Sequence, residues 1–309
     1  MALGRPGEEK SITDAKAVAD WLGIPFRIYD LSAEWRHDVA AYIGETYLAG
    51  KTPNPCIRCN ERIKFGLLPK AAFADGFGFF ATGHYAKTGV DSQGRAYLCR
   101  AVDRKKDQSY FLYRVRKDIL ARTIFPLGNL EKSEVRRIAA EFCAPVASKG
   151  DSQDFCGGDA MSYVDAPDRE GDIVDVDGNI LGRHRGFWHY TIGKRKGLGI
   201  GGGIPYYVVG LDAGENRVVV AFKEHAVAKG FKISSPVWLA SDNDLREASE
   251  SGELFVKVRS AGEPKGPVEL LGDTCIVPDG LSGVAPGQSA VFYRADYVLG
   301  GGIIDSILI

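Results

Sequence analysis

Two cysteines three residues apart close the segment Thr52-Pro53-Asn54-Pro55-Cys56-Ile57-Arg58-Cys59. The two prolines favour an extended backbone, after which a helix is predicted to begin at the second cysteine. The positive end of a helix dipole, together with nearby Arg58 and Arg62, lowers the pKa of a thiol and increases its thiolate fraction. The pattern therefore predicts a reactive Cys59 with Cys56 as a close neighbour.

A C-x-x-C pair also fits half of a zinc site, a redox pair or two buried cysteines. The sequence has no second C-x-x-C pair and no His at zinc-finger spacing, which disfavours structural zinc. Thioredoxin-like pairs follow a strand without a Pro-Asn-Pro lead-in, so a redox pair is disfavoured too. Two buried cysteines stay an open alternative.

Another cysteine, Cys156, lies in the polar segment Asp151-Ser152-Gln153-Asp154-Phe155-Cys156-Gly157, close to Lys149. Glycine and polar neighbours are typical of an exposed loop rather than a core, so this thiol is a second candidate for chemistry. An inert cysteine is the alternative.

The segment Thr82-Gly83-His84-Tyr85 follows the apolar run Phe77–Ala81, which is predicted to form a buried parallel strand. Ligands of open parallel sheets bind at the carboxyl ends of the strands. Gly83 would let a ligand approach the backbone closely, and His84 would reach the same crevice. A simple turn carrying a surface histidine fits the segment equally well.

The elements that must position these residues alternate between helix and strand in the first half of the chain, which predicts an α/β parallel-sheet domain up to about residue 160. The expected elements are a helix through Ala15–Leu22, capped by Ser11 or Thr13 and closed by Gly23; a strand over Ile24–Tyr29; helices over Glu34–Leu48 and Asn60–Phe73; and helices near Ile119 and over Glu131–Phe142.

The second half is richer in Gly and Val and predicts β structure. Expected strands are Asp172–Val176, Tyr206–Leu211, Arg217–Phe222, Leu254–Val258 and Ser289–Tyr293, with an Asp177-Gly178 hairpin turn after the first. A boundary near Lys223–Lys229 divides this half into two β-rich units. The predicted domains are therefore residues 1–163, 164–225 and 226–309.

Charge is balanced overall but unevenly distributed. The 309 residues carry 39 Lys+Arg and 40 Asp+Glu, for a net charge of −1, which at first disfavours a nucleic-acid binder. Yet Arg95–Lys117 carries +6 and Arg183–Lys196 carries +5, while Val146–Gly182 carries −7. Aromatic residues are interleaved with both basic stretches, and cations with flat rings suit RNA. A solvated charged face is the alternative.

Other classes of protein are disfavoured by composition. With 45% hydrophobic residues, the chain has enough apolar side chains to fold, so disorder is excluded as its main state. No apolar run approaches the ~20 residues of a membrane-spanning helix. Six cysteines are too few for a disulfide scaffold and no secretory signal is evident, so a cytoplasmic protein without a membrane partner is expected.

The chain resembles the tRNA-specific 2-thiouridylases from about Asp14 to the C-terminus. The resemblance rests on these blocks: Gly50-Lys51-Thr52-Pro53-Asn54-Pro55, Arg58-Cys59-Asn60, Ile63-Lys64-Phe65-Gly66, Ala81-Thr82-Gly83-His84-Tyr85, Lys106 to Tyr113, Phe125-Pro126-Leu127-Gly128, Asp151-Ser152-Gln153, Tyr190-Thr191-Ile192-Gly193, Arg195 to Ile200, Pro286-Gly287-Gln288-Ser289-Ala290-Val291 and Leu299 to Ile304. It implies an ATP-pyrophosphatase-type, Rossmann-like α/β domain, a small β-rich central domain and a C-terminal β-barrel.

The resemblance also implies a reaction. ATP with Mg²⁺ would adenylate O2 of the wobble uridine of a tRNA, and sulfur would then replace that oxygen. Cys156 would carry a persulfide received from a sulfur-relay protein, and Cys59 would release the sulfur by forming a transient disulfide with Cys156. No DNA partner is implied.

Further roles are implied for residues in the matching blocks. Gly83 would touch the nucleotide, and Asn54, Pro55 and Cys56 would border the flipped target base. The expected tRNA contacts are His84, Lys106, Asp107, Gln108, Arg259, Ser260 and Gln288.

Two features depart from the family's pattern. Members begin with a strand and a Ser-Gly-Gly-x-Asp-Ser phosphate loop, and this sequence has neither, so its α/β domain is expected to lack the first strand, phosphate loop, first helix and next strand, and ATP-dependent activation is expected to be weak or absent. A catalytically impaired tRNA-binding homologue is therefore an alternative.

The second departure is Cys56, which stands where many members have Asp. Cys56, Cys59 and Cys156 could together hold an iron–sulfur cluster with one open iron, which gives a second alternative, an iron–sulfur-dependent tRNA thiolase. No other metal site is expected.

Overall fold

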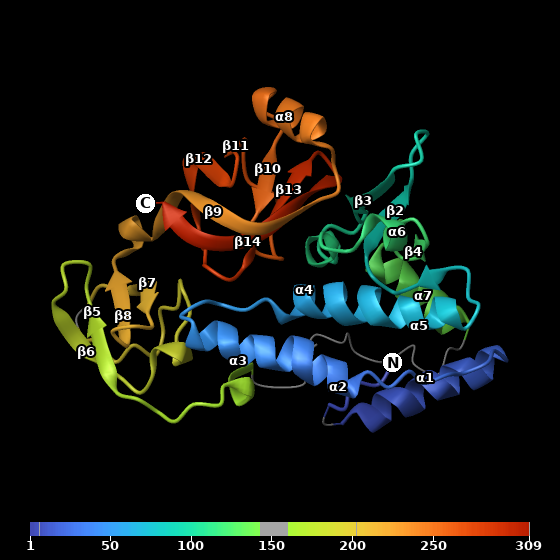
Figure 1. Ribbon diagram of the computed structural model, residues 1–309, viewed down its shortest axis with the longest axis horizontal. Coiled ribbons are helices and arrows are strands. Elements are labelled where there is room, and N and C mark those ends of the chain that lie inside the picture. The colour runs from blue at the N-terminus through green and yellow to red at the C-terminus, as the bar shows by residue number, and fades with distance from the viewer. Residues whose placement is uncertain (6, 143–159, 202, 309) are drawn as a thin grey trace. The chain divides into compact units, whose positions relative to one another are not determined.

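The computed structural model describes residues 1–5, 7–142, 160–201 and 203–308. These residues form two compact units. Unit 1 comprises Met1–Ala40, the described part of Pro55–Asp159 and Asp296–Val298, and unit 2 comprises Ala41–Asn54, Ala160–Ala295 and the described part of Leu299–Ile309. Figure 1 shows the elements of both.

Unit 1 is mainly helical, with short strands. Its helices are α1 (Glu8–Leu22), α2 (Ser32–Trp35), the π-helix η1 (Arg36–Ala40), α4 (Pro55–Cys59), the π-helix η2 (Asn60–Leu67), α5 (Leu68–Ala74), the 3-10 helix η3 (Ser109–Leu112), α6 (Lys117–Leu120) and α7 (Lys132–Glu141). Its strands are β1 (Phe80–Ala81), β2 (Ala86–Val90), β3 (Ala96–Arg100) and β4 (Thr123–Ile124). β1 and β4 pair in parallel, and β2 and β3 form an antiparallel hairpin.

The first helix was predicted correctly at its end but not at its start. Gly23 closes α1 in the left-handed conformation (φ 65°), as expected. The helix begins after Gly7, however, so Ser11 and Thr13 do not cap it; the Thr13 hydroxyl instead donates to the Glu9 carbonyl inside the helix.

The strand expected over Ile24–Tyr29 is wrong. A strand needs a hydrogen-bonded neighbour along its length. In the described chain this region has only one isolated bridge at its end, between Ala2 and Asp30. Ile24 and Ile28 consequently stay about half exposed, at 53% and 51%.

The cysteine-bearing helix starts earlier than expected. It begins at Pro55 and runs through α4, η2 and α5 to Ala74. Proline is well tolerated in the first turn of a helix, where its missing N–H would have had no intrahelical partner. Cys59 is therefore the last residue of α4, and Cys56 occupies the N-terminal turn, which reverses the expected placement.

The apolar run Phe77–Ala81 forms a parallel strand only at its end. The strand β1 is Phe80–Ala81, opposite Thr123 and Ile124 of β4. Phe77 and Phe79 are 51% and 67% exposed, so the predicted burial is wrong.

Unit 2 contains two β-rich parts. Its helices are α3 (Ala41–Leu48), the 3-10 helices η4 (Ala160–Tyr163), η5 (Phe187–His189) and η6 (Lys223–Ala226), and α8 (Asp242–Glu250). Its strands are β5 (Gly171–Val174), β6 (Ile180–His184), β7 (Tyr207–Asp212), β8 (Arg217–Ala221), β9 (Val227–Trp238), β10 (Phe255–Lys257), β11 (Glu269–Leu271), β12 (Thr274–Ser282), β13 (Ser289–Arg294) and β14 (Tyr297–Leu308), the last beginning within unit 1.

The first β-rich part is a four-stranded sheet in the order β6-β5-β8-β7. The hairpin predicted at Asp177-Gly178 is confirmed: β5 and β6 pair antiparallel, and Gly178 has a φ of 88°. The core of this part contains Ile173, Val218 and Val220 together with aromatic side chains described below.

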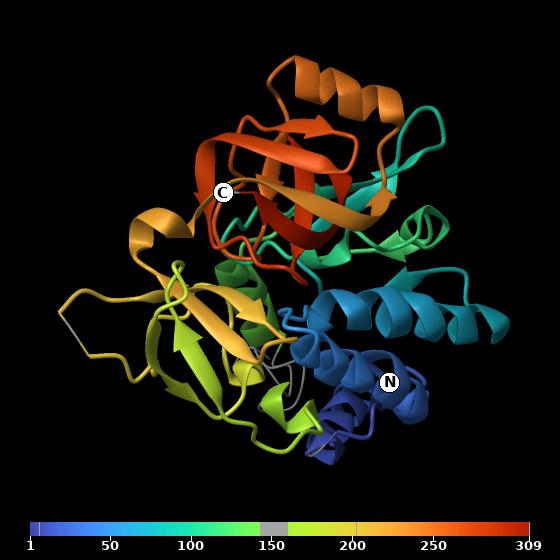
Figure 2. The same ribbon diagram turned by 60° about the vertical axis from the view of Figure 1, so that its left-hand side comes forward.

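The second β-rich part follows the pairing path β10-β13-β14-β9-β12-β11. The long strands β9 and β14 curve around its core, as both views show (Figures 1 and 2). Phe231, Val256 and Phe292 lie in that core with exposures of 0%. Among the described residues the path does not close into a ring, so the expected barrel is open here.

Candidate functional site

Cys59 lies in unit 1 beside a small cavity of about 10 Å³, which has room for about one water molecule. Its side chain is only 6% exposed. The cavity is lined by Cys56, Cys59, Asn60, Lys64, His84, Gln108 and Phe111. The structure thus brings together four of the residues singled out from the sequence, namely both cysteines, His84 and Gln108.

The predicted activation of Cys59 is wrong in direction. Burial raises the pKa of this thiol, because a thiolate loses its hydration inside the protein. The charges of Lys64 and Arg5 and a hydrogen bond with Trp35 counteract the rise in pKa only in part. The thiol is therefore mostly protonated at neutral pH.

The helix dipole and the two arginines that were expected to lower the pKa of Cys59 do not act on its thiol. Because Cys59 ends α4, it does not lie at the positive end of that helix. Arg58 and Arg62 both approach Glu61, at 3.9 Å each, instead of the thiol. None of the three residues that act on this thiol was predicted: Arg5 and Trp35 lie 54 and 24 positions before Cys59, and Lys64 follows it by five on the next helical segment.

Cys56 lies one helical turn before Cys59, on the same side of α4. It is partly exposed, whereas Cys59 is buried. Pro55, its neighbour in the first turn, is also partly exposed. This pair therefore places one accessible and one protected thiol at the same cavity.

His84 is a neutral imidazole in this site. Burial, with a smaller contribution from the charge of Lys64, lowers the pKa of His84 from 6.5 to about 3. The ring packs against Phe65 and Phe125 with centroids 5.4 and 6.0 Å away, and Nδ1 lies 2.8 Å from the Thr82 hydroxyl. His84 can therefore exchange hydrogen bonds with a ligand without carrying charge.

The loop before η3 holds the His84 segment in place. The Gln108 side-chain oxygen accepts a hydrogen bond from the Tyr85 N–H at 2.9 Å, and the Gln108 N–H donates to the Tyr85 carbonyl at 2.8 Å. Asp107 is buried, and its carboxylate accepts hydrogen bonds from the Ala101 N–H and the Ser109 hydroxyl. Its carboxylate is thus used inside the fold, while the neighbouring Lys106 is partly exposed.

Asn60 contributes a buried polar group that was not among the predicted site residues. Its amide nitrogen donates to the Phe111 carbonyl at 3.2 Å. Its oxygen is buried and has no hydrogen-bond partner among the described residues. A buried acceptor without a donor is costly, so this oxygen at the cavity is suited to a ligand or water donor.

Gly83 directly follows β1 and Thr82, at the carboxyl end of the parallel pair. A Cβ atom there would meet only the Leu127 side chain, at 3.7 Å, which is an ordinary contact. The fold itself therefore does not require glycine at this position.

In unit 2, Asn54 and Gln288 contact each other. The Asn54 amide donates to the Gln288 side-chain oxygen at 3.3 Å, and the Gln288 amide donates to the Pro53 carbonyl at 2.7 Å. The Asn54 N–H donates to the Tyr42 hydroxyl at 3.1 Å. Two residues separated by 234 positions, both expected at the RNA, thus fix the segment that leads into the cysteine helix.

Most cations of the basic stretch Arg95–Lys117 are paired inside unit 1. Its five arginines form ion pairs, which are Arg95–Asp91, Arg100–Asp107, Arg104–Asp296, Arg114–Glu61 and Arg116–Asp118. Four of the partner carboxylates, Asp91, Asp296, Glu61 and Asp118, lie outside the stretch and offset four of its six net positive charges.

The aromatic residues of the stretch Arg183–Lys196 do not form a stacking surface. Phe187, Trp188 and Tyr190 are 4%, 5% and 8% exposed and belong to the core of the four-stranded sheet. The 3-10 helix η5 carries Phe187 and Trp188, and both rings pack into this core. The expectation of exposed rings for base stacking is wrong for these three residues.

Two predicted features involve residues outside the described ranges: the Cys156 segment 151–157, and the iron–sulfur cluster that would include Cys156. The disulfide between Cys156 and Cys59 therefore stays a prediction. In the part of the chain that the structure describes, no three His, Cys, Asp or Glu side chains are grouped to hold a metal ion.

Arg259 and Ser260, two of the expected tRNA contacts, are described, and both are exposed.

Three family models match successive parts of the chain. They are the tRNA methyl transferase HUP domain over residues 2–157, the tRNA methyl transferase PRC-barrel domain over 163–222 and the aminomethyltransferase beta-barrel domain over 228–304. Together with the cysteine cavity, they define an α/β tRNA-modifying protein with two appended β domains. No described helix is long and apolar enough to span a membrane.

The chain belongs to the tRNA-specific 2-thiouridylase family. It is 42% identical over 306 residues to the tRNA-specific 2-thiouridylase MnmA of Endomicrobium trichonymphae, covering 96% of this chain and 84% of the relative. The corresponding protein of Pelobacter propionicus is 43% identical over 307 residues, covering 96% and 85%. That of Gloeothece citriformis is 42% identical over 308 residues, covering 96% and 87%.

Proposed function

We propose that this chain thiolates the wobble uridine of tRNA at C2, using ATP and a persulfide on Cys156. Membership of the 2-thiouridylase family supports the reaction, and the HUP-type domain implies use of ATP. The observation that carries the proposal for this chain is the cavity of unit 1, where Cys59 lies with Cys56, Lys64 and His84. A tRNA substrate also makes the cytoplasm the expected site of action.

The proposed reaction begins by converting O2 of the uridine into a leaving group. O2 attacks the α-phosphate of ATP, and pyrophosphate leaves. The terminal sulfur of the Cys156 persulfide then attacks C2, and AMP departs with the former O2. The uridine is now joined to Cys156 through a sulfur–sulfur bond.

Cys59 completes the exchange. Its thiolate attacks the Sγ of Cys156, the bond between the two sulfurs breaks, and the sulfur left on C2 becomes the thiocarbonyl. Cys59 and Cys156 end as a disulfide, which an external dithiol must reduce before the next turnover. A relay protein would reload Cys156 with sulfane sulfur.

The remaining cavity residues have roles that follow from their contacts. Lys64 stabilises the Cys59 thiolate when it forms. Neutral His84 and the unpartnered oxygen of Asn60 offer hydrogen bonds to an uncharged base. Gly83 leaves room for the nucleotide. Since the cavity has room for only about one water, its side chains must separate before a pyrimidine enters.

The test is formation of 2-thiouridine in a tRNA transcript incubated with the chain, MgATP, a polysulfide and a dithiol, read by mass spectrometry of digested nucleosides. Cys59→Ser and Cys156→Ser are expected to abolish the product. Cys99→Ser and Cys275→Ser are matched controls, because these buried thiols do not line the cavity. Product formation by Cys59→Ser equal to that of the controls would refute the role of Cys59.

A second candidate is a tRNA-binding protein without ATP-dependent activation. The observation that favours it is that the cavity at Cys59 has room for only about one water and that burial raises the pKa of the Cys59 thiol. ATP–pyrophosphate exchange distinguishes the two: tRNA binding without exchange indicates the binder, and exchange with thiolation indicates the enzyme. Iron-dependent thiolation, with iron present in anaerobically purified protein, would instead support a cluster held by Cys56, Cys59 and Cys156.

A further inference from the structure

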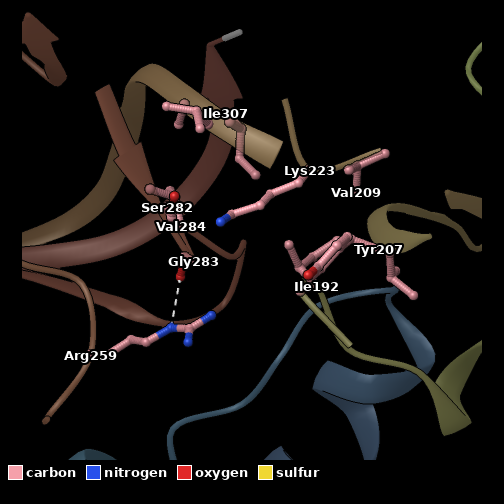
Figure 3. Close-up of a pocket in the computed structure, with 13 residues that line it drawn as sticks. Ile192, Tyr207, Val209, Lys223, Arg259, Ser282, Gly283, Val284 and Ile307 are labelled. Carbon is pink, nitrogen blue, oxygen red and sulfur yellow. Dashed lines mark hydrogen bonds between the residues drawn. The ribbon is translucent and has the colours of Figure 1, made fainter. Parts of the chain in front are cut away.

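A second cavity lies in unit 2, between the four-stranded sheet and the C-terminal strands. Its volume is about 220 Å³, far larger than the cavity at Cys59. Figure 3 shows apolar side chains along much of its wall, with Lys223, Arg259 and Ser282 as the polar groups. Ile192, Val209, Val284 and Ile307 contribute to the apolar wall.

The Arg259 guanidinium is held at this cavity by backbone rather than by a carboxylate. Its Nε donates to the Gly283 carbonyl at 3.1 Å (Figure 3). A Cβ on Gly283 would come within 2.4 Å of the guanidinium, and one on Gly193 within 3.3 Å. Two glycines with φ of 78° and 83° thus make the space in which the guanidinium lies.

Lys223 provides a second positive charge. It extends from η6 and brings its amino group into the cavity (Figure 3). Among the described residues no Asp or Glu lines the cavity, and neither Lys223 nor Arg259 forms an ion pair with a described carboxylate. Both therefore differ from the paired arginines of unit 1, and their charge is available to an anion.

The combination of two cations with an apolar wall selects a particular kind of ligand. Phosphate suits the guanidinium and the ammonium, while a base or ribose suits the apolar surface. Drug-sized ligands occupy cavities of roughly 300–1,000 Å³, so this smaller one suits a single nucleotide unit. A carboxylate ligand without an apolar portion would leave most of the wall unused.

We propose that this cavity binds one nucleotide of the tRNA other than the reacting uridine, with its phosphate between Arg259 and Lys223 and its base or ribose against Ile192 and Val284. The inference rests on the proposed function, because it takes tRNA as the substrate. The resemblance implied a tRNA contact for Arg259; the cavity, Lys223 and the two glycines extend that contact to a built nucleotide site. A site of this kind would fix the register of the RNA on unit 2.

The test measures the affinity of the full chain for a fluorescent tRNA transcript at several salt concentrations. Lys223→Gln and Arg259→Gln are each expected to weaken binding about tenfold and to lower the slope of log affinity against log salt by about 1, as loss of one phosphate contact does. Lys232→Gln is the matched control, since Lys232 is exposed in the same unit but does not line the cavity.

A steric variant separates the cavity from charge alone. Ile192→Trp keeps both cations but fills the space, and it is expected to weaken binding with an unchanged salt slope. Ethylation interference gives a further readout: one phosphate whose ethylation blocks binding to the original chain should lose its effect in Lys223→Gln. The proposal is overturned if the three cavity variants bind tRNA as the Lys232→Gln control does.

The source of the nucleotide and the proposed function are tested separately. If UMP or AMP binds the chain in a Lys223-dependent manner while tRNA affinity is unaffected by Lys223→Gln, the site takes a free nucleotide and the RNA proposal is wrong. Formation of 2-thiouridine by the original chain is then measured at saturating tRNA. Lys223-dependent tRNA binding without any 2-thiouridine would refute the proposed function and leave this site standing.

Discussion

Gln108 and Tyr85 are joined by two hydrogen bonds, one through the side-chain oxygen of Gln108 at 2.9 Å and one through its backbone N–H at 2.8 Å. The pair connects the loop before η3 to the segment that carries Gly83 and His84. One wall of the cysteine cavity therefore depends on a single glutamine.

Replacing Gln108 by Leu is expected to lower the free energy of unfolding by about 1–3 kcal/mol, because the Tyr85 N–H loses its acceptor. Gln108→Glu keeps an acceptor oxygen and should lose less. Urea denaturation of the two variants measures the difference. Equal stability of Gln108→Leu and the original chain would show that this hydrogen bond does not hold the segment.

The reactivity of Cys59 should depend steeply on pH. Because burial raises its pKa above the ordinary value of 9.0, the rate of alkylation should rise about tenfold per pH unit through pH 9 without a plateau. Lys64→Gln removes a charge that lowers this pKa, so it should slow alkylation at any given pH. Peptide-resolved mass spectrometry after iodoacetamide pulses measures the rates.

The control for this prediction is Lys70→Gln, which removes an exposed cation from α5 outside the cavity. It should leave the rate at Cys59 unchanged. A plateau below pH 8 in the original chain would show that the thiol is activated and that burial does not dominate its pKa.

Because His84 is buried as the neutral imidazole, the free energy of unfolding should depend on pH. Its pKa is about 3 in the folded chain and 6.5 in the ordinary case, so below pH 6.5 the unfolded chain binds a proton that the folded chain does not. Stability from this group is complete above pH 6.5 and falls by at most about 1.4 kcal/mol per pH unit toward pH 3. His84→Gln should flatten that part of the stability profile, measured by urea denaturation between pH 4.5 and 7.5. An unchanged slope would contradict a buried, neutral His84.

Gly83 and Gly128 should respond differently to substitution by Ala. A Cβ at Gly83 meets only Leu127 at 3.7 Å, whereas one at Gly128 would lie 2.0 Å from the Ala86 carbonyl oxygen. Gly83→Ala is therefore expected to keep its thermal stability and to impair the ATP-dependent step, measured as AMP formation in the presence of tRNA. Gly128→Ala should instead lower the unfolding temperature by several degrees. Normal AMP formation by Gly83→Ala would remove Gly83 from the nucleotide site.

Local patterns were sufficient where neighbouring residues decide the structure. Gly23 ends a helix because a glycine tolerates the left-handed conformation, and Asp177-Gly178 turns a hairpin for a related reason. The same reasoning found the α/β class with two appended β parts. It also selected Cys56, Cys59 and His84, and the family resemblance added Gln108; the structure brings all four to one cavity.

Local sequence patterns failed to predict burial and strand pairing, because contacts between residues distant in the sequence determine both. The polar neighbours of Cys59 in sequence gave no sign that Trp35 and the cavity wall would bury it and raise its pKa. Phe187, Trp188 and Tyr190 alternate with cations in the sequence, yet their rings are buried in the core of the four-stranded sheet. Residues 24–29 have strand-forming side chains but lack a neighbouring strand in the described chain.

The π-helix that follows Cys59 has a consequence for changes of chain length. Residues five apart point to different sides of an α-helix, but the i→i+5 hydrogen bonding of η2 places them nearly one above the other, and Lys64 follows Cys59 by five. Deleting one residue between them would restore an ordinary α-helix in which the lysine follows Cys59 by four, which keeps both on one face, whereas inserting a residue would rotate the ammonium away from the sulfur. This stretch should therefore tolerate a one-residue deletion better than a one-residue insertion.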